Sequence, residues 1–447
     1  MANNNDLTRR YDNYAVYLPA IQRPFAKATY NKGKADRVFP DNLTLRDLNF
    51  LNPNSKLWHY GYGLYSAGQF GINERTADIV TNRDGSVVVL GDSGGYQIGK
   101  GTYPGFDKLQ RYKTGDAIAG AWRDAVAVRR WIVEWLEAHA NYAMTIDMPL
   151  WAKLPQQSKT PFHKCSTEQL IALSVENLKY IKANQRGRTK WLSVIQGTSR
   201  EDMRMWWDAV KQYRFSGWAL AGGTGWRAGI SEVLHQVLVM RDEGAFVRGE
   251  DWIHMLGVSQ AKWAVLLTAI QRGLRAKTNP QLRVSYDSAS PTLLAARYQR
   301  IALYPNLSND ASTWSIKAVP SPNYAKYATS SHPFPFMSPI GDRMLLAHLN
   351  VKAEKFDPKH YDDISGHLLT NHNSWVYIRA FLEANDLAYL DRHDALNFVP
   401  KSLLDAKDFI EDVLQQDRWA ATLKKNSKLL AAVDKLSAAE QVADDLR

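Results

Sequence analysis

The stretch WLSVIQGTSREDMRMWW, residues 191–207, contains one strand, one loop and the start of one helix, and it decides the fold. Residues 191–197 form a short, mostly apolar run that ends on glycine, which indicates a buried strand. A helix is expected over about 200–213, with Ser199 as its N-cap because a serine oxygen can accept from the first free N–H groups. A buried strand that leads directly into a helix is typical of α/β proteins.

The same unit repeats on both sides of this stretch. The expected strands are VVVLGD (87–92), YAMTIDMP (142–149), WLSVIQG (191–197), GWALAGG (217–223), WIHMLGVS (252–259) and LRVSYD (282–287). The expected helices lie near 116–140, 167–184, 200–213, 230–241, 260–275 and 291–301. Six such units predict a parallel sheet, and the region 37–86 could supply one or two more strands, with WHYGYGLYS (58–66) as a candidate.

We expect an α/β protein with a (β/α)8 TIM-type barrel, because no glycine-rich nucleotide fingerprint of an open doubly wound sheet follows any strand. The barrel is predicted over residues 61–375, preceded by a basic and aromatic extension over 1–60. Residues 376–447 are expected to form a C-terminal helical appendage, with helices near 374–390 and 402–447.

Composition restricts the class of protein. The 447 residues are 45% hydrophobic and 23% charged, which is typical of a soluble globular chain. No apolar run approaches the roughly 18 residues of a membrane span, and the start MANNNDLTRR (1–10) has no signal-peptide core. Cys165 is the only cysteine, which excludes a disulfide framework and a cysteine-based zinc cluster. We therefore expect a cytoplasmic protein without membrane association.

Basic residues are concentrated before the C-terminal region. The formal net charge is +11, and residues 401–447 carry eight Lys or Arg and nine Asp or Glu. In the stretch 23–37, basic residues alternate with aromatic ones, a pattern that suits a polyanion. The candidates for nucleic-acid binding there are Arg23, Lys27, Lys32 and Lys34. The alternative is that this stretch is an ordered wrap around the barrel.

Polar residues and glycines stand at the ends of the six expected strands. They are Asp92, Asp147, Gln196, Gly222 with Gly223, Gly257 and Asp287. In a parallel barrel the carboxyl ends of the strands surround the active site. A single Asp after a strand is more often a helix cap or loop anchor, but three of them with an amide indicate a site.

Two carboxylates at one site can divide the work of nucleophile and acid/base at a glycosidic bond. The third Asp and Gln196 suit the polar edge of a planar ligand, because Asp accepts from ring N–H groups and Gln both donates and accepts. Tyr96 could stack on a ring face. A nucleobase fits this set better than a sugar.

At this point the motifs resemble a known family. DSGGYQ (92–97), VIQG (194–197), ALAGG (219–223), MLGVS (255–259) and YDSASP (286–291) are similar, in order and spacing, to the motif series of the tRNA-guanine transglycosylases. Those enzymes use a (β/α)8 barrel to exchange guanine for a 7-deazaguanine base. DSGGYQ is the most specific of the motifs.

The resemblance implies roles for individual residues. Asp287 would be the nucleophile that attacks C1′ of the target nucleotide, and Asp92 would be the general acid/base. The remaining residues would bind the base: Asp147, Gln196, Gly222 and Gly223 at its edge, Tyr96 on its face, and Ser93 and Leu256 around it.

The chain also departs from the family. The family has a zinc site of three cysteines and one histidine, but PFMSPIGDRMLLAHL (335–349) has no cysteine, so we predict that the zinc site is lost. His372, in TNHNSW (370–375), is then expected to be a packing or capping residue. The loop after Asp287 also differs, with Arg297 and Arg300 further on as candidate nucleic-acid contacts, which puts recognition of tRNA in question.

A chain that keeps the motifs without zinc resembles most the DNA-modifying branch of the family, the DpdA-type 7-deazaguanine DNA transglycosylases of some bacteria and viruses. The expected substrates are then DNA and a free 7-deazaguanine base, the 7-cyano form by resemblance, with no cofactor. If the source is viral, the location is the cytoplasm of a bacterial host. Loss of the zinc region makes either a monomer or a homodimer compatible with the sequence.

Three alternatives remain open. The first is a tRNA-guanine transglycosylase. The second is a base-releasing N-glycosidase or nucleoside hydrolase in which water replaces the incoming base, although a hydrolase has no second base to read. The third is a non-catalytic nucleic-acid-binding protein on the same barrel, although retention of both Asp92 and Asp287 argues against it.

Overall fold

The computed structural model describes residues 6–197, 199–221, 229–322, 327–349 and 362–436. Its centre is a sheet of eight parallel strands in the order β1-β8-β7-β6-β5-β4-β3-β2. The strands are β1 (Val16–Pro19), β2 (Tyr62–Ser66), β3 (Val88–Asp92), β4 (Tyr142–Met144), β5 (Lys190–Ile195), β6 (Gly217–Leu220), β7 (Trp252–Met255) and β8 (Arg283–Ser288). A parallel bridge between Ala20 and Leu64 joins the two edges, so the barrel is nearly closed. The predicted fold class is confirmed.

The N-terminal part of the barrel differs from the expectation. The candidate strand in 58–66 is β2, but the remaining strand comes from Val16–Pro19 rather than from 37–86. β1 pairs along its whole length with β8, in the register Val16 to Ser285. The expected extension 1–60 therefore contains a barrel strand. A four-residue apolar run is too short to show a period, so only its pairing identifies it.

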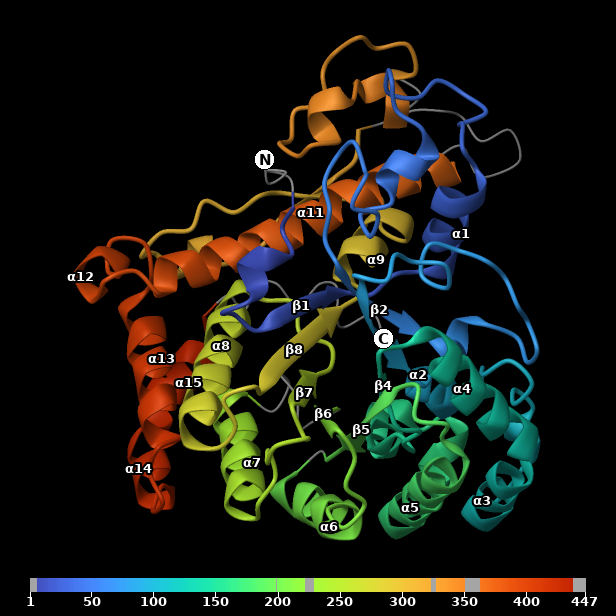
Figure 1. Ribbon diagram of the computed structural model, residues 1–447, viewed down its shortest axis with the longest axis vertical. Helices are drawn as coiled ribbons and strands as arrows, with labels where there is room; N and C mark the ends of the chain where they lie inside the picture. Colours follow the sequence, from blue (N-terminus) through green and yellow to red (C-terminus); the bar gives the residue numbers. More distant parts are fainter. Residues whose placement is uncertain (1–5, 198, 222–228, 323–326, 350–361, 437–447) are drawn as a thin grey trace.

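Helices alternate with the strands and lie outside them (Figure 1). They are α2 (Gly95–Lys100), α3 (Gly115–Asp124), α4 (Val126–His139), α5 (Thr167–Asn184), α6 (Arg200–Val210), α7 (Ile230–Asp242), α8 (Ala261–Lys277) and α9 (Ser290–Ala296). Ser199 caps α6 by accepting from the N–H of Asp202, and Ser166 with Gln169 forms the capping box of α5. The helix expected over 116–140 is two helices that meet at Ala125.

The basic stretch 23–37 begins with α1 (Arg23–Asn31), which buries Phe25, Ala26 and Thr29 and packs on the short helical turn Leu45–Leu48. At least one aromatic residue of this stretch packs inside the protein, since the Phe25 ring stacks on that of Phe50. α1 follows β1 directly in the sequence and lies beside the amino-terminal end of α11 (Figure 1), where the Phe25 ring contacts that of His367.

The C-terminal region packs closely on the barrel. α11 (Asp363–Ala388) contacts α8, α9 and β1, so the expected boundary at 375/376 falls inside one continuous helix. It is followed by α12 (Arg392–Ala395), α13 (Lys401–Val413), α14 (Ala420–Lys425) and α15 (Ser427–Asp434). Asp434 accepts from the N–H of Ile230 at the start of α7, and the buried Lys262 donates to the carbonyl of Asp434. In the sequence between α9 and α11, β9 (Arg300–Ala302) and β10 (Ala318–Pro320) pair as a two-stranded antiparallel sheet.

Contacts across the barrel show which side chains point inward. The rings of Tyr142 on β4 and Trp252 on β7 lie 4.2 Å apart, although two strands, β5 and β6, separate them in the sheet order. Arg283 on β8 donates to the hydroxyl of Tyr62 on β2. Side chains alternate between the two faces of a strand. The inward set therefore continues with His254 on β7, and with Ser285 and Asp287 on β8.

Side chains of β3 also alternate between the interior and the exterior of the barrel. Tyr62 is paired with Val88 and Ser66 with Asp92, so Asp92 belongs to the inward set as well. The interior is filled by large rings at the amino ends of the strands, and the two carboxylates stand at the carboxyl ends. This arrangement is that of a barrel with a packed core and a polar mouth.

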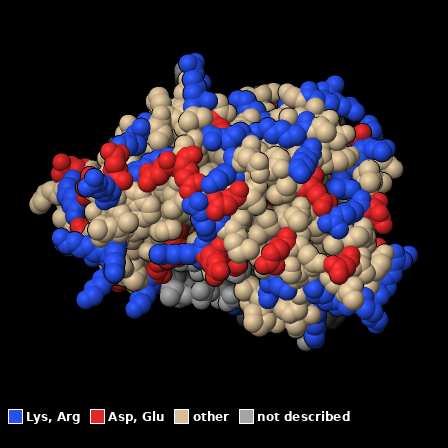
Figure 2. All heavy atoms as spheres, turned by 90° about the horizontal axis from the view of Figure 1, so that it is seen from below, with Lys and Arg blue, Asp and Glu red and all other residues tan. Residues whose placement is uncertain are grey.

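Charges of both signs are interspersed over the face drawn in Figure 2, where Lys and Arg alternate with Asp and Glu. No helix in the described parts of the chain is both long enough and apolar enough to cross a membrane.

Candidate active site

The predicted site residues come from the ends of three neighbouring strands, β3, β4 and β5, and from β8, which is not adjacent to them in the sheet. Asp92 ends β3, Asp147 and Gln196 follow β4 and β5, and Asp287 lies near the end of β8. Gly222 and Gly223, which were expected to contact the base edge, lie outside the described residues.

Asp287 is buried, and backbone N–H groups of the turn after β7 hold it. Gly257 donates its N–H to Asp287 Oδ1 at 2.9 Å, and Val258 donates to the backbone carbonyl of Asp287 at 2.7 Å. Gly257 has a φ of 75°, in the left-handed region that glycine adopts without strain, and this turn aims its N–H at the carboxylate. A carboxylate fixed in one position by these contacts is suited to nucleophilic attack.

Asp92 is half-buried at the mouth of the barrel. Its Oδ1 accepts from the N–H of Gly94 at 3.2 Å, in the turn that leads into α2. Gly94 has a φ of 88°, and a Cβ there would lie 2.6 Å from the ring of Tyr103. The two glycines of DSGGYQ therefore allow close packing within the protein, and this packing fixes the direction of Asp92.

Asp147 and Gln196 form a pair. Gln196 Nε2 donates to Asp147 Oδ2, and Gln196 Oε1 accepts from the N–H of Leu150 at 2.7 Å. The bond to Leu150 fixes which end of the amide faces the carboxylate. Gln196 is buried, so it orients Asp147 as well as lining the site. A Cβ on Gly95 would lie 3.2 Å from Asp147 Oδ1, which shows how closely α2 approaches this carboxylate.

Burial raises the pKa of Asp147, the hydrogen bond from Gln196 lowers it and the charge of Asp92 raises it, and together these effects bring it to about 7. The carboxyl groups of Asp92 and Asp147 are therefore close enough for the charge of one to affect the pKa of the other. Carboxyl groups with strongly shifted pKa values are concentrated at functional sites. Asp147 can therefore change protonation state near neutral pH when a ligand binds.

Asp147 should make the protein less stable as the pH rises. The folded state keeps the proton of Asp147 up to about pH 7, whereas the unfolded chain releases it near 3.8. Between these values the folded state binds more protons, so the free energy of unfolding falls by up to about 1.4 kcal/mol per pH unit. Asp147→Asn keeps an acceptor for Gln196 and removes this loss. Urea denaturation should show the variant gaining stability relative to the wild type from pH 5 to pH 8, and a constant difference would contradict the shift.

The other predicted base-binding residues take different positions. Ser93 is fully buried, and its hydroxyl donates to the carbonyl of Thr145 at 3.3 Å. Tyr96 is 41% exposed on α2, and its ring stacks on Trp151 with 5.7 Å between centroids. Leu256 is half-buried after β7 and donates its N–H to Leu220. Ser93 thus supports the loop, and Tyr96 offers an aromatic surface that it shares with Trp151.

The predicted nucleic-acid contacts divide into engaged and exposed residues. Arg23 pairs with Glu74, and its guanidinium lies 4.9 Å from the ring of Phe70, so it serves the fold. Lys32 and Lys34 are exposed. Arg297 is exposed at the end of α9, with its guanidinium 5.6 Å from the ring of Tyr298.

Two further basic candidates are partly covered. Lys27 is half-buried on α1. Arg300 is half-buried at the start of β9, and its carbonyl accepts from Asn373 at 3.1 Å.

His372 has the packing role that was expected. Its Nδ1 lies 2.7 Å from Ser338 Oγ and its Nε2 lies 3.0 Å from the carbonyl of Ala302. Burial lowers the pKa of His372 to about 4. Within the described ranges, no group of three or more His, Cys, Asp or Glu side chains is arranged to hold a metal ion.

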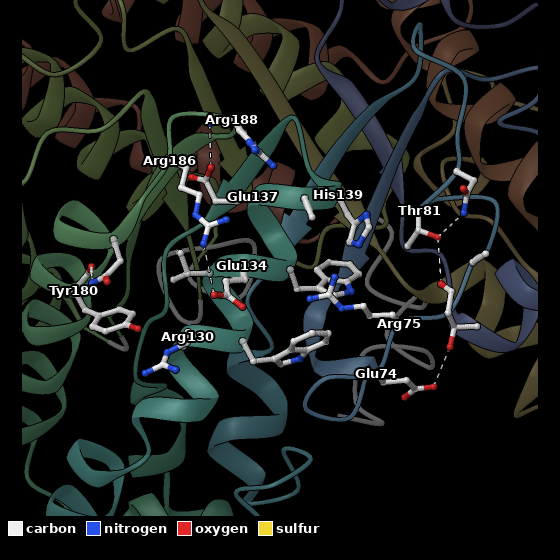
Figure 3. Close-up of a pocket in the computed structure, with 18 residues that line it drawn as sticks. Glu74, Arg75, Thr81, Arg130, Glu134, Glu137, His139, Tyr180, Arg186 and Arg188 are labelled. Atoms are coloured by element: carbon white, nitrogen blue, oxygen red, sulfur yellow. Dashed lines mark hydrogen bonds and ion pairs between the residues drawn. The ribbon is translucent and has the colours of Figure 1, made fainter.

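A surface groove of about 630 Å³ lies on the outer wall of the barrel and was not predicted (Figure 3). It is lined by residues 74–82, by α4 and by the end of α5 with the loop after it. Four arginines, Arg75, Arg130, Arg186 and Arg188, line the groove together with the acidic Glu74, Glu134 and Glu137. Arg186 Nη2 is 3.8 Å from Glu134 Oε1. None of the predicted catalytic or base-binding residues lines this groove.

Sequence reasoning missed His254, which is fully buried on β7. Its Nε2 lies 3.3 Å from Asp287 Oδ1, and its Nδ1 lies 2.9 Å from Ser285 Oγ. The signal was a histidine inside the otherwise apolar strand of WIHMLGVS. No pattern in the sequence links it to Asp287, 33 positions later, because the pairing of β7 with β8 creates the contact.

No protein-family model and no curated protein matches this chain.

Proposed function

We propose that this protein is a guanine transglycosylase that exchanges guanine in DNA for a free 7-deazaguanine base, with 7-cyano-7-deazaguanine as the preferred base. The observation that carries the proposal is the placement of Asp92 and Asp287. Both belong to the inward-facing set of the barrel, and both stand at its carboxyl end. The motifs DSGGYQ and YDSASP, which resemble those of tRNA-guanine transglycosylases, surround these two residues.

The reaction would proceed by two displacements. In the first, a carboxylate oxygen of Asp287 forms a bond to C1′ of the target nucleotide while the bond from C1′ to N9 of guanine breaks. Asp92, in its protonated form, gives its proton to the departing guanine. In the second, Asp92 as the carboxylate removes the N9 proton of the incoming base, whose N9 attacks C1′ and releases Asp287. Two inversions leave the configuration at C1′ unchanged.

Asp147 and Gln196 would read the base. Guanine presents ring N1–H and exocyclic N2–H donors on one edge, and a carboxylate accepts from both. A pKa near 7 in the empty site means that binding would draw Asp147 into its charged form. The same edge is present on guanine and on 7-deazaguanine, so one pair of residues serves both halves of the exchange. A hydrolase would need this recognition only once.

DNA is preferred to tRNA as the substrate because the chain resembles the DNA-modifying branch of the family. The segment that corresponds to the zinc site has no cysteine, and the loop after Asp287 differs from that of the tRNA enzymes. In duplex DNA the target base must leave the stack, at a cost of a few kcal/mol. Lys32, Lys34 and Arg297 are exposed, and we propose that these cations contact the backbone of the distorted strand.

Exchange should occur on DNA and not on tRNA. The protein is incubated with guanine-labelled duplex DNA, single-stranded DNA and bulk tRNA in separate reactions, and 7-cyano-7-deazaguanine is then added. The expected result is release of labelled guanine from DNA with equal incorporation of the added base. The Asp287→Asn variant is the control for release that does not involve the proposed nucleophile.

Each other result has a definite meaning. Release from tRNA alone would reverse the choice of substrate and keep the transglycosylase chemistry. Release without any added base would indicate an N-glycosidase. No release from any nucleic acid, by a folded protein supplied with guanine or 7-deazaguanine bases, would refute the proposed activity.

A further inference from the structure

We infer that His254 is a positioning residue for the Asp287 carboxylate, acting through a chain of buried groups from Trp252 to Ser285 to His254 to Asp287. The inference deepens the proposed function and rests on it, because it assigns a role relative to the proposed nucleophile. His254 does not contact the base or the sugar in this scheme. It would hold the carboxylate in one orientation while C1′ approaches.

The chain of contacts determines which nitrogen of His254 carries the proton. Trp252 Nε1, which can only donate, lies 2.6 Å from Ser285 Oγ. The serine oxygen accepts that bond, so its own hydrogen is available for His254 Nδ1 at 2.9 Å. Nδ1 is then an acceptor, and in the neutral imidazole the proton is on Nε2. Nε2 faces Asp287 Oδ1 at 3.3 Å.

The distance of 3.3 Å is long for an N–H···O hydrogen bond. Donors and acceptors in unliganded active sites are often this far apart and come together when substrate binds. His254 Nε2 is buried and forms no formal hydrogen bond with the described residues. An unsatisfied N–H in such a place is costly. A small movement of Asp287 towards His254 would bring its carboxylate within hydrogen-bond distance of the Nε2–H group.

A purely structural role explains less of what surrounds His254. The strand neighbours of His254 are Ala219 on β6 and Ser285 on β8, both of them small. They provide space for the imidazole inside the barrel, directly below the mouth. A residue that only filled this space would need no polar partner on either ring nitrogen. Here both nitrogens face polar atoms, and the second of these belongs to the proposed nucleophile.

If His254 positions Asp287, its loss should lower the rate of covalent-intermediate formation and leave the KM for the free base nearly unchanged. His254→Phe removes the donor, and formation of the covalent intermediate should slow by about 10- to 100-fold, because a small misplacement of a reacting group costs a rate factor of this order. The KM for the free base should stay within about twofold, because His254 does not touch the base. His254→Gln carries an N–H at about the reach of Nε2 and should recover part of the rate. Thermal unfolding checks that each variant is folded.

A matched variant tests the chain one step further away. Ser285→Ala removes the partner of Nδ1 and leaves Asp287 and Gly257 unchanged, so it should slow the same step by a smaller factor. Folded His254→Phe protein that forms the intermediate at the wild-type rate would overturn the inference. So would an equal loss in the Phe and Gln variants, since that would indicate packing alone.

A spectroscopic measurement separates this inference from the proposed function. Nitrogen NMR of the wild-type protein should show the His254 proton on Nε2, and Asp287→Asn should shift that resonance. A proton on Nδ1 of the neutral ring, or a His254 resonance that does not shift in Asp287→Asn, would overturn the proposed role of His254 even if exchange is observed. Failure of wild-type exchange with the expected NMR result would instead refute the proposed function alone.

Discussion

Asp287→Asn should abolish guanine exchange, with a loss on the order of 10⁴-fold or more, because an amide cannot form the covalent bond to C1′. The substitution is nearly isosteric. The amide oxygen can still accept from Gly257, which donates to Asp287 Oδ1 in the wild type, so the turn after β7 should remain intact. The measurement is the rate of labelled guanine release, together with trapping of a protein–DNA adduct by denaturation during turnover.

A control for Asp287→Asn is the same substitution at Asp417, an exposed residue that pairs with Lys277 on the surface. Asp417→Asn should exchange guanine at the wild-type rate and give the wild-type amount of adduct. Adduct formation by folded Asp287→Asn protein would show that another residue is the nucleophile.

Asp92→Asn should slow both halves of the exchange by about 10²- to 10⁴-fold, the usual contribution of a general acid/base. Guanine is a poor leaving group unless it is protonated, and the incoming base is a poor nucleophile until it loses its N9 proton. The Asn side chain can keep the contact to the N–H of Gly94 that Asp92 Oδ1 makes. Single-turnover measurements of adduct formation and of adduct decay would each detect the loss.

A change of leaving group distinguishes the two carboxylates. Guanine methylated at N7 is cationic and leaves without receiving a proton, and a site that accepts a substituent at position 7 of the incoming base has room for the methyl group. In Asp92→Asn, adduct formation from N7-methylated DNA should recover towards the wild-type rate, while decay of the adduct stays slow. Asp287→Asn should show no recovery. Equal recovery in both variants would contradict the assignment of roles.

Much of the fold could be predicted from the sequence because its signals are local. Strands that are buried on both faces have short apolar sequences. N-cap residues such as Ser166 and Ser199 mark where the following helices begin. The positions of Asp92 and Asp287 at strand ends followed from the same alternation. Parallel strands have their carboxyl ends at one edge, so these residues had to share the mouth of the barrel.

Other parts could not be predicted because they depend on pairing between distant segments. β1 has four residues, and only its pairing with β8 identifies it. The contacts of Arg23 with Glu74 and Phe70 could not be predicted either, because nothing near Arg23 in the sequence indicates them. Gln196 was expected to read the base, and the N–H of Leu150 also makes it a support for Asp147.

The sequence by itself determined the β/α alternation, the helix caps and the set of carboxylates at the strand ends. Only the tertiary structure decided which side of each strand faces the interior, because strands buried on both faces show no polar alternation. It thereby decided that His254 stands beneath Asp287 rather than outside the barrel. It also decided the protonation of Asp147, because burial and the nearby charge of Asp92, not the residue type, set that pKa.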